Sequence, residues 1–122
     1  MDKDLKVTVT RVEATSVNPS AKHTTVSITI DEQPAYLNKH GNDIKIRWKI
    51  DDPSNQGWKF TDDGIALKGD WGGKFANEGS AHGGKHYVWK RIMADNGKYE
   101  YTIRVTDGVA TASWDPSIIN QP

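Results

Sequence analysis

The sequence predicts an all-β fold, a two-sheet antiparallel β-sandwich of about seven strands with Greek-key connections. Val, Ile and Thr together supply 28 of the 122 residues, whereas Leu supplies only 3. β-Branched side chains are stiff in helices but fit the pleated surface of a sheet. Several short runs alternate apolar and polar residues, and no amphipathic helical pattern of useful length interrupts them. We therefore expect a single β-sandwich domain over residues 1–122.

Two strands are expected in the first thirty residues. Leu5, Val7 and Val9 alternate with polar residues, which predicts a first strand with one buried face. The alternation changes parity after Arg11, so we expect a bulge or a change of sheet there. A second strand is predicted over residues 26–30, where Val and Ile again alternate with Ser and Thr.

The middle of the chain combines one clear strand with a glycine-rich region. Residues 44–50 carry an apolar side chain at every second position, the pattern of a half-buried strand. Residues 53–84 are rich in Gly, Asp and Asn, and they contain two short candidate strands at 58–61 and 65–68.

A further strand over residues 85–92 can face either way. Tyr87 and Trp89 lie on one of its sides, and Val88 and Ile92 lie on the other. The sequence leaves open which pair enters the core.

The last part of the chain predicts a β-hairpin. Residues 99–106 alternate strictly, and Asp107-Gly108 is a favoured two-residue hairpin turn. This turn places Ile103 opposite Ala112 and Tyr101 opposite Trp114. The predicted core face of the hairpin carries Tyr101, Ile103, Val105, Ala110, Ala112 and Trp114.

The motif Asp95-x-Gly97-x-Tyr99-x-Tyr101 resembles the Asp-x-Gly-x-Tyr-x-Cys signature of strand F in immunoglobulin-like domains. The resemblance implies that Tyr99 is a "tyrosine corner", whose hydroxyl bonds to backbone a few residues upstream, and that Tyr101 stands at the second cysteine position. It also implies that Trp48 corresponds to the buried strand-C tryptophan and Ile28 to the first cysteine. Because the chain has no cysteine, apolar contact would replace the disulfide.

The resemblance extends to bacterial modules. Residues 99–108 look like the ending of bacterial immunoglobulin-like and polycystic-kidney-disease-type (PKD) modules. Over residues 44–120 the chain is similar to a group of small stand-alone bacterial proteins of unknown function. The shared segments are Gly57-Trp58-x-Phe60, Asp63-Gly64-Ile65, Tyr99-x-Tyr101-Thr102 and Asp115-Pro116-Ser117-Ile118-Ile119-Asn120. The resemblance implies an immunoglobulin-like fold and no particular activity.

Charge, cysteine content and the N-terminal residues restrict the partners. Sixteen basic and sixteen acidic side chains cancel, so we expect neither nucleic acid nor an anionic membrane as a partner. The absence of cysteine excludes thiol catalysis and thiolate metal sites. The chain begins without the apolar core of a signal peptide, which predicts a cytoplasmic protein; a protein whose signal had been removed would be secreted.

His82 and His86 are candidate ligand-binding residues. On a helix this spacing would place both imidazoles on one face as metal ligands, but two glycines lie between them, and Asp70 is the one nearby candidate for a third ligand. We expect two solvated loop histidines and no metal site.

Two acidic pairs, Asp51-Asp52 and Asp62-Asp63, lie at loop positions where sandwich modules often bind Ca²⁺. No loop has the ligand spacing of a calcium cage, and Asp before Pro or Gly is ordinary turn chemistry. We therefore expect no cofactor, with calcium as the alternative.

The five tryptophans are candidates for ligand stacking. Trp48 and Trp114 are predicted in the core. Trp58 and Trp71 remain as candidate binding residues, and Trp71, flanked by glycines, is the better candidate for an exposed ring. A loop tryptophan that seals the open end of the sandwich is the alternative.

The chain carries no nucleophile elbow, P-loop, dinucleotide fingerprint or zincin motif. We therefore expect a non-enzymatic binding or interaction module that recognises a protein or glycan through loops at one end, with Trp58, Trp71 and residues 79–86. One alternative is a carbohydrate-binding module that uses exposed Trp. Another is a self-associating structural protein, a homodimer rather than a monomer, formed through outward-facing Tyr87 and Trp89.

Overall fold

The structure is a computed structural model that describes residues 2–17, 20–37, 42–69 and 73–120, with the backbone alone for 12–17 and 20–25. Within these residues the chain forms ten strands and no helix, which confirms the all-β prediction. None of these residues therefore belongs to a helix that could span a lipid bilayer. The strands are β1 (Lys3–Val17), β2 (Ser20–Ile30), β3 (Ala35–Tyr36), β4 (Ile44–Asp51), β5 (Lys59–Leu67), β6 (Phe75–Ala81), β7 (His86–Arg91), β8 (Gly97–Thr106), β9 (Thr111–Trp114) and β10 (Ser117–Asn120).

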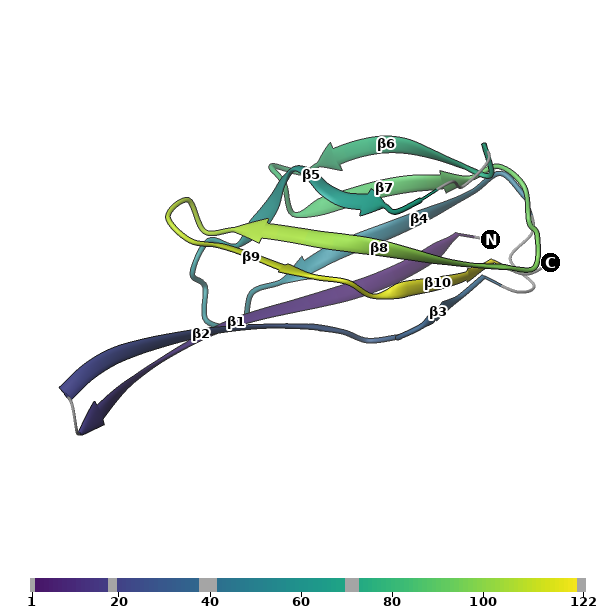
Figure 1. The fold of residues 1–122 in the computed structure, drawn as a ribbon. Coiled ribbons are helices and arrows are strands. Elements are labelled where there is room, and N and C mark those ends of the chain that lie inside the picture. Colours follow the sequence, from purple (N-terminus) through teal and green to yellow (C-terminus); the bar gives the residue numbers. More distant parts are fainter. Residues whose placement is uncertain (1, 18–19, 38–41, 70–72, 121–122) are drawn as a thin grey trace.

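The strands form two sheets that face each other across the core (Figure 1). One sheet has the order β2-β1-β4-β7-β6, and the other has the order β3-β10-β8-β5, with β9 also paired to β8. The expectation of purely antiparallel sheets is wrong, because β1 runs parallel to β4 and β3 runs parallel to β10. Parallel neighbours need a crossover connection, and the chain makes one by passing through β3 in the other sheet between β2 and β4.

The core contains an aromatic pair that bridges the two sheets. Trp48 of β4 and Tyr101 of β8 are fully buried, their ring centroids are 5.3 Å apart, and Trp48 Nε1 donates a hydrogen bond of 3.1 Å to Tyr101 Oη. Burial raises the pKa of the Tyr101 hydroxyl. Strands C and F of an immunoglobulin domain share a sheet, whereas β4 and β8 lie in opposite sheets.

The predicted alternation is confirmed in β1 and β4. Leu5, Val7 and Val9 of β1 are buried, as are Ile46 and Trp48 of β4. The partly buried side chains of β2 pack against the same cluster, namely Val26, Ile28 and Ile30. Period-2 patterning therefore located the inner face of this sheet correctly.

β1 and β2 form a longer and more regular hairpin than the sequence predicts. They pair without interruption from Val7 opposite Ile30 to Val17 opposite Ser20, so the pairing contains no bulge near Arg11. Figure 1 shows that the far part of this hairpin projects from the body as an arm. Beyond Arg11 the strands leave the core, and the alternation that a buried face requires is no longer needed.

The β8–β9 hairpin is shifted from its predicted register by two residues. Ile103 lies opposite Trp114 and Val105 opposite Ala112, so the turn spans residues 107–110 instead of Asp107-Gly108 alone. The Asp107 carboxylate accepts hydrogen bonds from the backbone N–H of Val109 and Ala110 at 2.9 and 2.7 Å. These bonds stabilise the longer turn.

Because the register shift is two residues, each side chain stays on its predicted face of the hairpin, but the extent of burial differs from the prediction. Tyr101, Ile103 and Val105 are buried as predicted. Trp114, predicted in the core, is 36% exposed, and Val109 at the turn is 94% exposed. Trp114 is partly uncovered because it lies at the end of β9, which pairs only with β8 among the described strands.

β7 faces the core with its aromatic side. Tyr87 and Trp89 are buried, and Trp89 Nε1 donates a hydrogen bond of 2.8 Å to the carbonyl of Ile65. Val88 is partly buried and Ile92 is exposed. The hypothesis of a dimer contact through outward-facing Tyr87 and Trp89 is therefore wrong, because both rings are used in the core.

Tyr99 is tied to a residue four positions upstream. Its hydroxyl donates to the carboxylate of Asp95, which also accepts a hydrogen bond of 2.8 Å from the backbone N–H of Gly97. A Cβ at Gly97 would lie 2.8 Å from the Tyr99 ring, so the close approach requires glycine. The partner seen here is a side chain, whereas the tyrosine corner predicts a backbone group.

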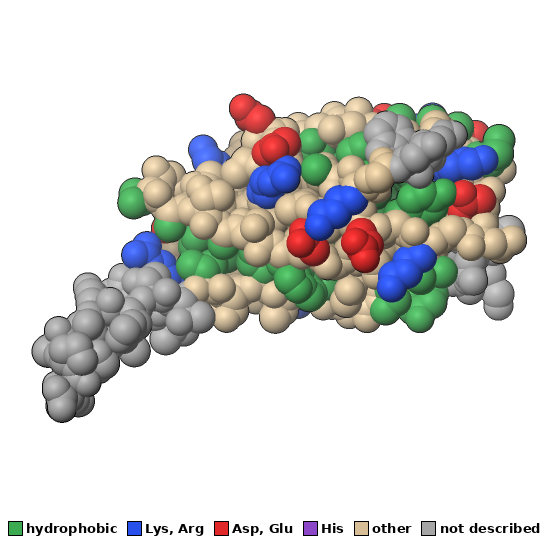
Figure 2. All heavy atoms as spheres, viewed as in Figure 1, with side chains coloured by type: hydrophobic (Ala, Val, Ile, Leu, Met, Phe, Trp, Pro, Cys, Tyr) green, Lys and Arg blue, Asp and Glu red, His purple; other side chains and the backbone are tan. Residues whose placement is uncertain are grey.

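The outer surface mixes charges of both signs. Figure 2 shows basic and acidic side chains interspersed on one face of the body. Several are paired, including Arg104 with Asp63 at 2.8 Å and Lys68 with Asp115 at 3.1 Å.

Candidate functional site

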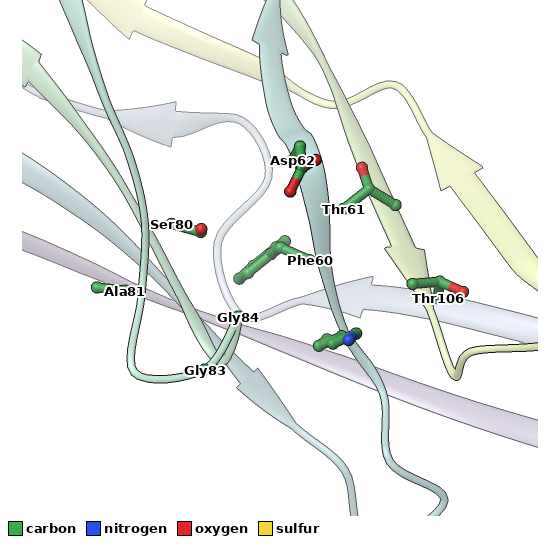
Figure 3. A pocket seen from close by; sticks show the side chains of 9 residues that line it. Phe60, Thr61, Asp62, Ser80, Ala81, Gly83, Gly84 and Thr106 are labelled. Carbon is green, nitrogen blue, oxygen red and sulfur yellow. The ribbon is translucent and has the colours of Figure 1, made fainter.

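A groove of about 610 Å³ lies at one side of the sandwich, where the edge of one sheet meets the edge of the other. We call it the β5–β6 groove. The start of β5 forms one wall, and the end of β6 with the following turn forms the other (Figure 3). Its lining residues are Lys59, Phe60, Thr61, Asp62, Ser80, Ala81, Gly83, Gly84 and Thr106.

A bulge in β5 shapes the first wall. Phe60 pairs with Val105 and Ile65 with Ile103, so the residues between Phe60 and Ile65 are displaced from the ladder. Gly64 closes the bulge, and a Cβ there would lie 2.6 Å from the Phe60 Cβ. Glycine at position 64 is therefore required for β5 to bend in this way.

A tight turn shapes the second wall. His82, Gly83 and Gly84 all have positive φ values, of 53°, 65° and 84°. The Phe60 N–H donates a hydrogen bond of 2.8 Å to the carbonyl of Gly84, which fixes this turn against β5. The glycines predicted as part of a binding loop thus form one side of the groove.

Three polar side chains of the groove are left without a partner among the described residues. Lys59, Asp62 and Ser80 make no side-chain hydrogen bond or ion pair within that part of the chain. The other polar side chains are engaged: Thr61 Oγ1 donates to Asp63 at 2.8 Å, and Thr106 Oγ1 donates to the carbonyl of Ala110 at 2.8 Å. An ammonium, a carboxylate and a hydroxyl therefore remain available in one groove.

The floor of the groove is aromatic. Figure 3 shows the Phe60 side chain pointing from β5 into the space between the walls, with Asp62 further along the same strand and Ser80 on the facing strand. Phe60 is buried, and its ring packs edge-on against Tyr87 with centroids 5.9 Å apart. The groove thus combines a small apolar floor with polar rims.

His82 and His86 lie next to each other beside this turn, with ring centroids 4.3 Å apart. Burial lowers the pKa of His86, and the nearby charges of His82, Lys49 and Arg47 lower it further. No group of three or more His, Cys, Asp or Glu side chains suited to a metal ion occurs among the described residues. Asp70, the suggested third ligand, lies outside them.

The first acidic pair is used in the fold. The Asp52 carboxylate accepts hydrogen bonds from the backbone N–H groups of Gln56, Gly57 and Trp58 at 2.8 to 3.1 Å. Burial raises the pKa of Asp52, but these bonds and the nearby Lys85 outweigh it and lower the value overall. Asp52 therefore caps the loop that leads into β5, as ordinary turn chemistry predicts.

The second acidic pair is divided between two environments. The Asp63 carboxylate is paired with Arg104 at 2.8 Å and also accepts from Thr61. The side chain of Asp62 turns into the groove instead (Figure 3). The adjacent carboxylates thus face different surroundings.

Of the two tryptophans predicted to bind a ligand, the structure describes one. Trp58 is fully buried, and its Nε1 donates a hydrogen bond of 3.2 Å to Gln56 Oε1. Its ring faces cannot stack on a ligand, because the Asp52-capped loop turns Trp58 into the core. Trp71 lies outside the described residues.

Sequence reasoning missed a buried polar network at the opposite end of the sandwich. Arg91 is fully buried, and its Nη1 donates a hydrogen bond of 3.2 Å to Asn120 Oδ1. Asn120 Nδ2 in turn donates to the carbonyl of Met93 at 3.2 Å and to Asp95 Oδ1 at 3.0 Å. Arg91 belongs to one sheet and Asn120 to the other, so this network joins them.

The network was missed because its residues are scattered in the sequence. Arg91 stands two residues after Trp89 and four after Tyr87, so its side chain lies on the same face of β7 as these two buried aromatic residues. This alternation is the one signal in the sequence that could have placed Arg91 in the interior. Lys59 and Ser80 gave no signal either, because an isolated Lys or Ser occurs on most surfaces.

No protein-family model matches this chain, and no curated protein matches it in sequence. Its function must therefore be inferred from the groove itself.

Proposed function

We propose that the protein is a non-enzymatic binding module that recognises a polar ligand in the β5–β6 groove. The observation that carries the proposal is the unused set of Lys59, Asp62 and Ser80 on the rims of one concave surface. Ligand sites characteristically combine an apolar surface with a few convergent polar groups. The ligand would supply the hydrogen-bond partners that the described residues do not provide.

Binding is favoured over catalysis by the surroundings of the two side chains that could act as nucleophiles. Ser80 and Lys59 make no hydrogen bond to a general base among the described residues. An activated nucleophile needs such a neighbour or a strongly desolvated pocket. The open groove next to solvent offers Lys59 and Ser80 neither.

A glycan is the ligand class that the polar rim fits best, and an exposed segment of a partner protein is the second candidate. A carboxylate and a hydroxyl can accept from and donate to neighbouring sugar hydroxyls, while Lys59 offers further donors. Because Trp58 is buried and Phe60 is only 4% exposed, recognition would depend on hydrogen bonds instead of an aromatic platform. A protein segment would use the same groups through its main chain.

As part of this proposal, the protein resembles immunoglobulin-like domains in its architecture, by analogy alone. Two facing sheets, the Trp48–Tyr101 pair and the Tyr99–Asp95 bond support it. The placement of β4 and β8 in opposite sheets departs from immunoglobulin strand order. The analogy assigns no ligand.

The proposal is tested by NMR titration of ¹⁵N-labelled protein with a panel of neutral and acidic oligosaccharides and, separately, with short mixed-sequence peptides. We expect chemical-shift changes to cluster at residues 59–62, 80–84 and 106. Asp62→Asn should weaken binding at least tenfold, the equivalent of one charge-assisted hydrogen bond. Shift changes confined to another surface, or no change with any probe, would overturn the proposal.

The matched control is Glu100→Gln. Glu100 is an exposed carboxylate on β8, at the end of that strand remote from the groove. This variant removes the same charge and should leave the affinity unchanged. Equal losses in the two variants would mean that net charge, and not the groove, governs binding.

A further inference from the structure

Five of the described strands have an open edge, namely β2, β3, β5, β6 and β9, and all except β2 are short or carry features that discourage pairing with another chain; β9 has only four residues. β6 has a register shift between Asn77 and Gly79, with the charged Glu78 at the bulge. β5 has its own shift after Phe60, where two aspartates leave the ladder. β3 is only two residues long. Bulges, charges and short length are the usual protections of a sheet edge.

β2 is an edge strand without such protection. It is eleven residues long, and its pairing with β1 shows no shift in register. Its sequence contains no Pro, Asp or Glu and a single lysine, Lys22, whereas six of its residues are Thr, Val or Ile. This combination favours the addition of another strand.

The hydrogen-bond pattern shows which groups of β2 are available. The Asp31 N–H, directly after β2, donates a hydrogen bond of 3.1 Å to the carbonyl of Lys6 in β1. Because backbone groups alternate in direction along a strand, the odd-numbered residues of β2 face β1. The N–H and C=O groups of the even-numbered residues, such as Val26 and Ile28, therefore point to the free edge.

We propose that β2 pairs antiparallel with β2 of a second copy of this chain, which joins the two β2-containing sheets into one continuous sheet around a twofold axis. An interface of this kind is isologous, so the same strand must complement itself. Antiparallel self-pairing centred on residue 25 places Lys22 opposite residue 28, and self-pairing centred on residue 26 places it opposite residue 30; in neither case does it face the second Lys22. No like charges then face each other across the new ladder.

The shape of the molecule permits this arrangement. Figure 1 shows that the outer part of the β1–β2 hairpin stands clear of the two sheets. Pairing along this arm places the two bodies at opposite ends of the joined strands. The groove between β5 and β6 is at another edge, so the dimer and the proposed ligand site do not compete.

The first experiment is light scattering coupled to size-exclusion chromatography over a hundredfold range of protein concentration. We expect a concentration-dependent mass approaching twice the 13.6 kDa of one chain. Thr24→Pro removes an outward-facing N–H and should weaken the dimer at least tenfold, while its far-ultraviolet circular dichroism stays that of the wild type. The control Thr25→Pro removes an N–H that faces β1, so it should disturb the hairpin itself.

A second measurement remains informative if Thr24→Pro does not fold. The chain has no cysteine, so one cysteine placed in turn at each position from 23 to 27 is the sole thiol. Under oxidation, disulfide-linked dimer should peak at the one position that lies on the twofold axis, because a disulfide requires Cα atoms within about 7 Å. Ser113→Cys on β9 is the control and should form little dimer.

Either of two results would overturn the β2 dimer. One is a monomer at every protein concentration. The other is a dimer unaffected by Thr24→Pro, with cross-linking spread evenly over the scanned positions. Asp62→Asn should keep the dimer, so a failure of the groove proposal leaves this test unaffected.

Discussion

The two ends of the sandwich use their polar side chains in opposite ways. At the end of the sandwich where β7 and β10 finish (Figure 1), the buried side chains of Arg91 and Asn120 link the two sheets and hold the Asp95 carboxylate. In the β5–β6 groove, Lys59 and Asp62 are left without a partner among the described residues. Polar groups that stabilise a fold are paired within it, whereas groups that recognise a ligand must stay available.

The largest expected effect is at the buried network. Asn120→Ala removes the hydrogen bonds to Arg91, Met93 and Asp95 and leaves the buried Arg91 guanidinium without this acceptor. We expect the free energy of unfolding to fall by about 3 kcal/mol, since a buried polar group that loses its partner costs about 1–3 kcal/mol and a charged one costs more. Urea denaturation followed by tryptophan fluorescence measures the change. A loss below about 1 kcal/mol would show that the network is not what joins the two sheets.

The sequence predicts the features of the two ends that depend on local patterns, and it does not predict contacts between distant strands. Alternation correctly placed Leu5, Trp48 and Tyr101 in the core, because a half-buried strand imposes a period of two. The Arg91–Asn120 contact joins strands that are adjacent in neither the sequence nor a sheet. Alternation along one strand carries no information about such a pair.

The hairpin shows a second limit of sequence reasoning. Asp107-Gly108 predicts a two-residue turn from the propensity of the turn alone. The Asp107 side chain instead bonds the N–H groups of Val109 and Ala110, and Arg11 of β1 pairs with the same carboxylate at 3.2 Å. A contact between segments far apart in the sequence thus stabilises a longer turn. Each side chain of the hairpin stays on its predicted face, because the register shift is an even number of residues.

The lining of the groove overlaps the loop that the sequence proposed for binding, and the role of this loop in binding stays a prediction. The glycine-rich turn at residues 83 and 84 was expected to belong to the binding surface, and it lines the groove. Trp58 was expected there too, but the loop capped by Asp52 directs it into the core. The remaining groove residues come from β5 and β6, whose proximity depends on how the two sheets close.

The second prediction concerns the acid stability of the network around Asp95. Burial raises the pKa of Asp95, but hydrogen bonds from Tyr99, Gly97 and Asn120 outweigh it, so the folded-state pKa lies below the ordinary 3.8. The carboxylate is therefore favoured by folding. Its contribution to stability is complete above pH 3.8 and is lost as the pH falls through the lower folded-state value.

Asp95→Asn should consequently be less stable than the wild type at pH 6, and the difference should shrink as the pH falls below about 4. Thermal melts across this range measure it. Glu100→Gln serves as the control for a changed net charge. A difference that is constant with pH would mean that the Asp95 carboxylate acts by shape alone.

The smallest expected effect on the free energy of unfolding is in the groove, and it tests whether the polar side chains there are dispensable for the fold. The triple variant Lys59→Met, Asp62→Asn and Ser80→Ala removes all three unpaired polar groups. Each substitution should change the free energy of unfolding by no more than about 0.5 kcal/mol, because no bond among the described residues is lost. The same variant should lose ligand binding altogether.

Substantial destabilisation of the triple variant would show that these side chains belong to the fold and would remove the distinction between the two ends. Unchanged stability together with lost binding is the pattern of residues that serve recognition and not the fold.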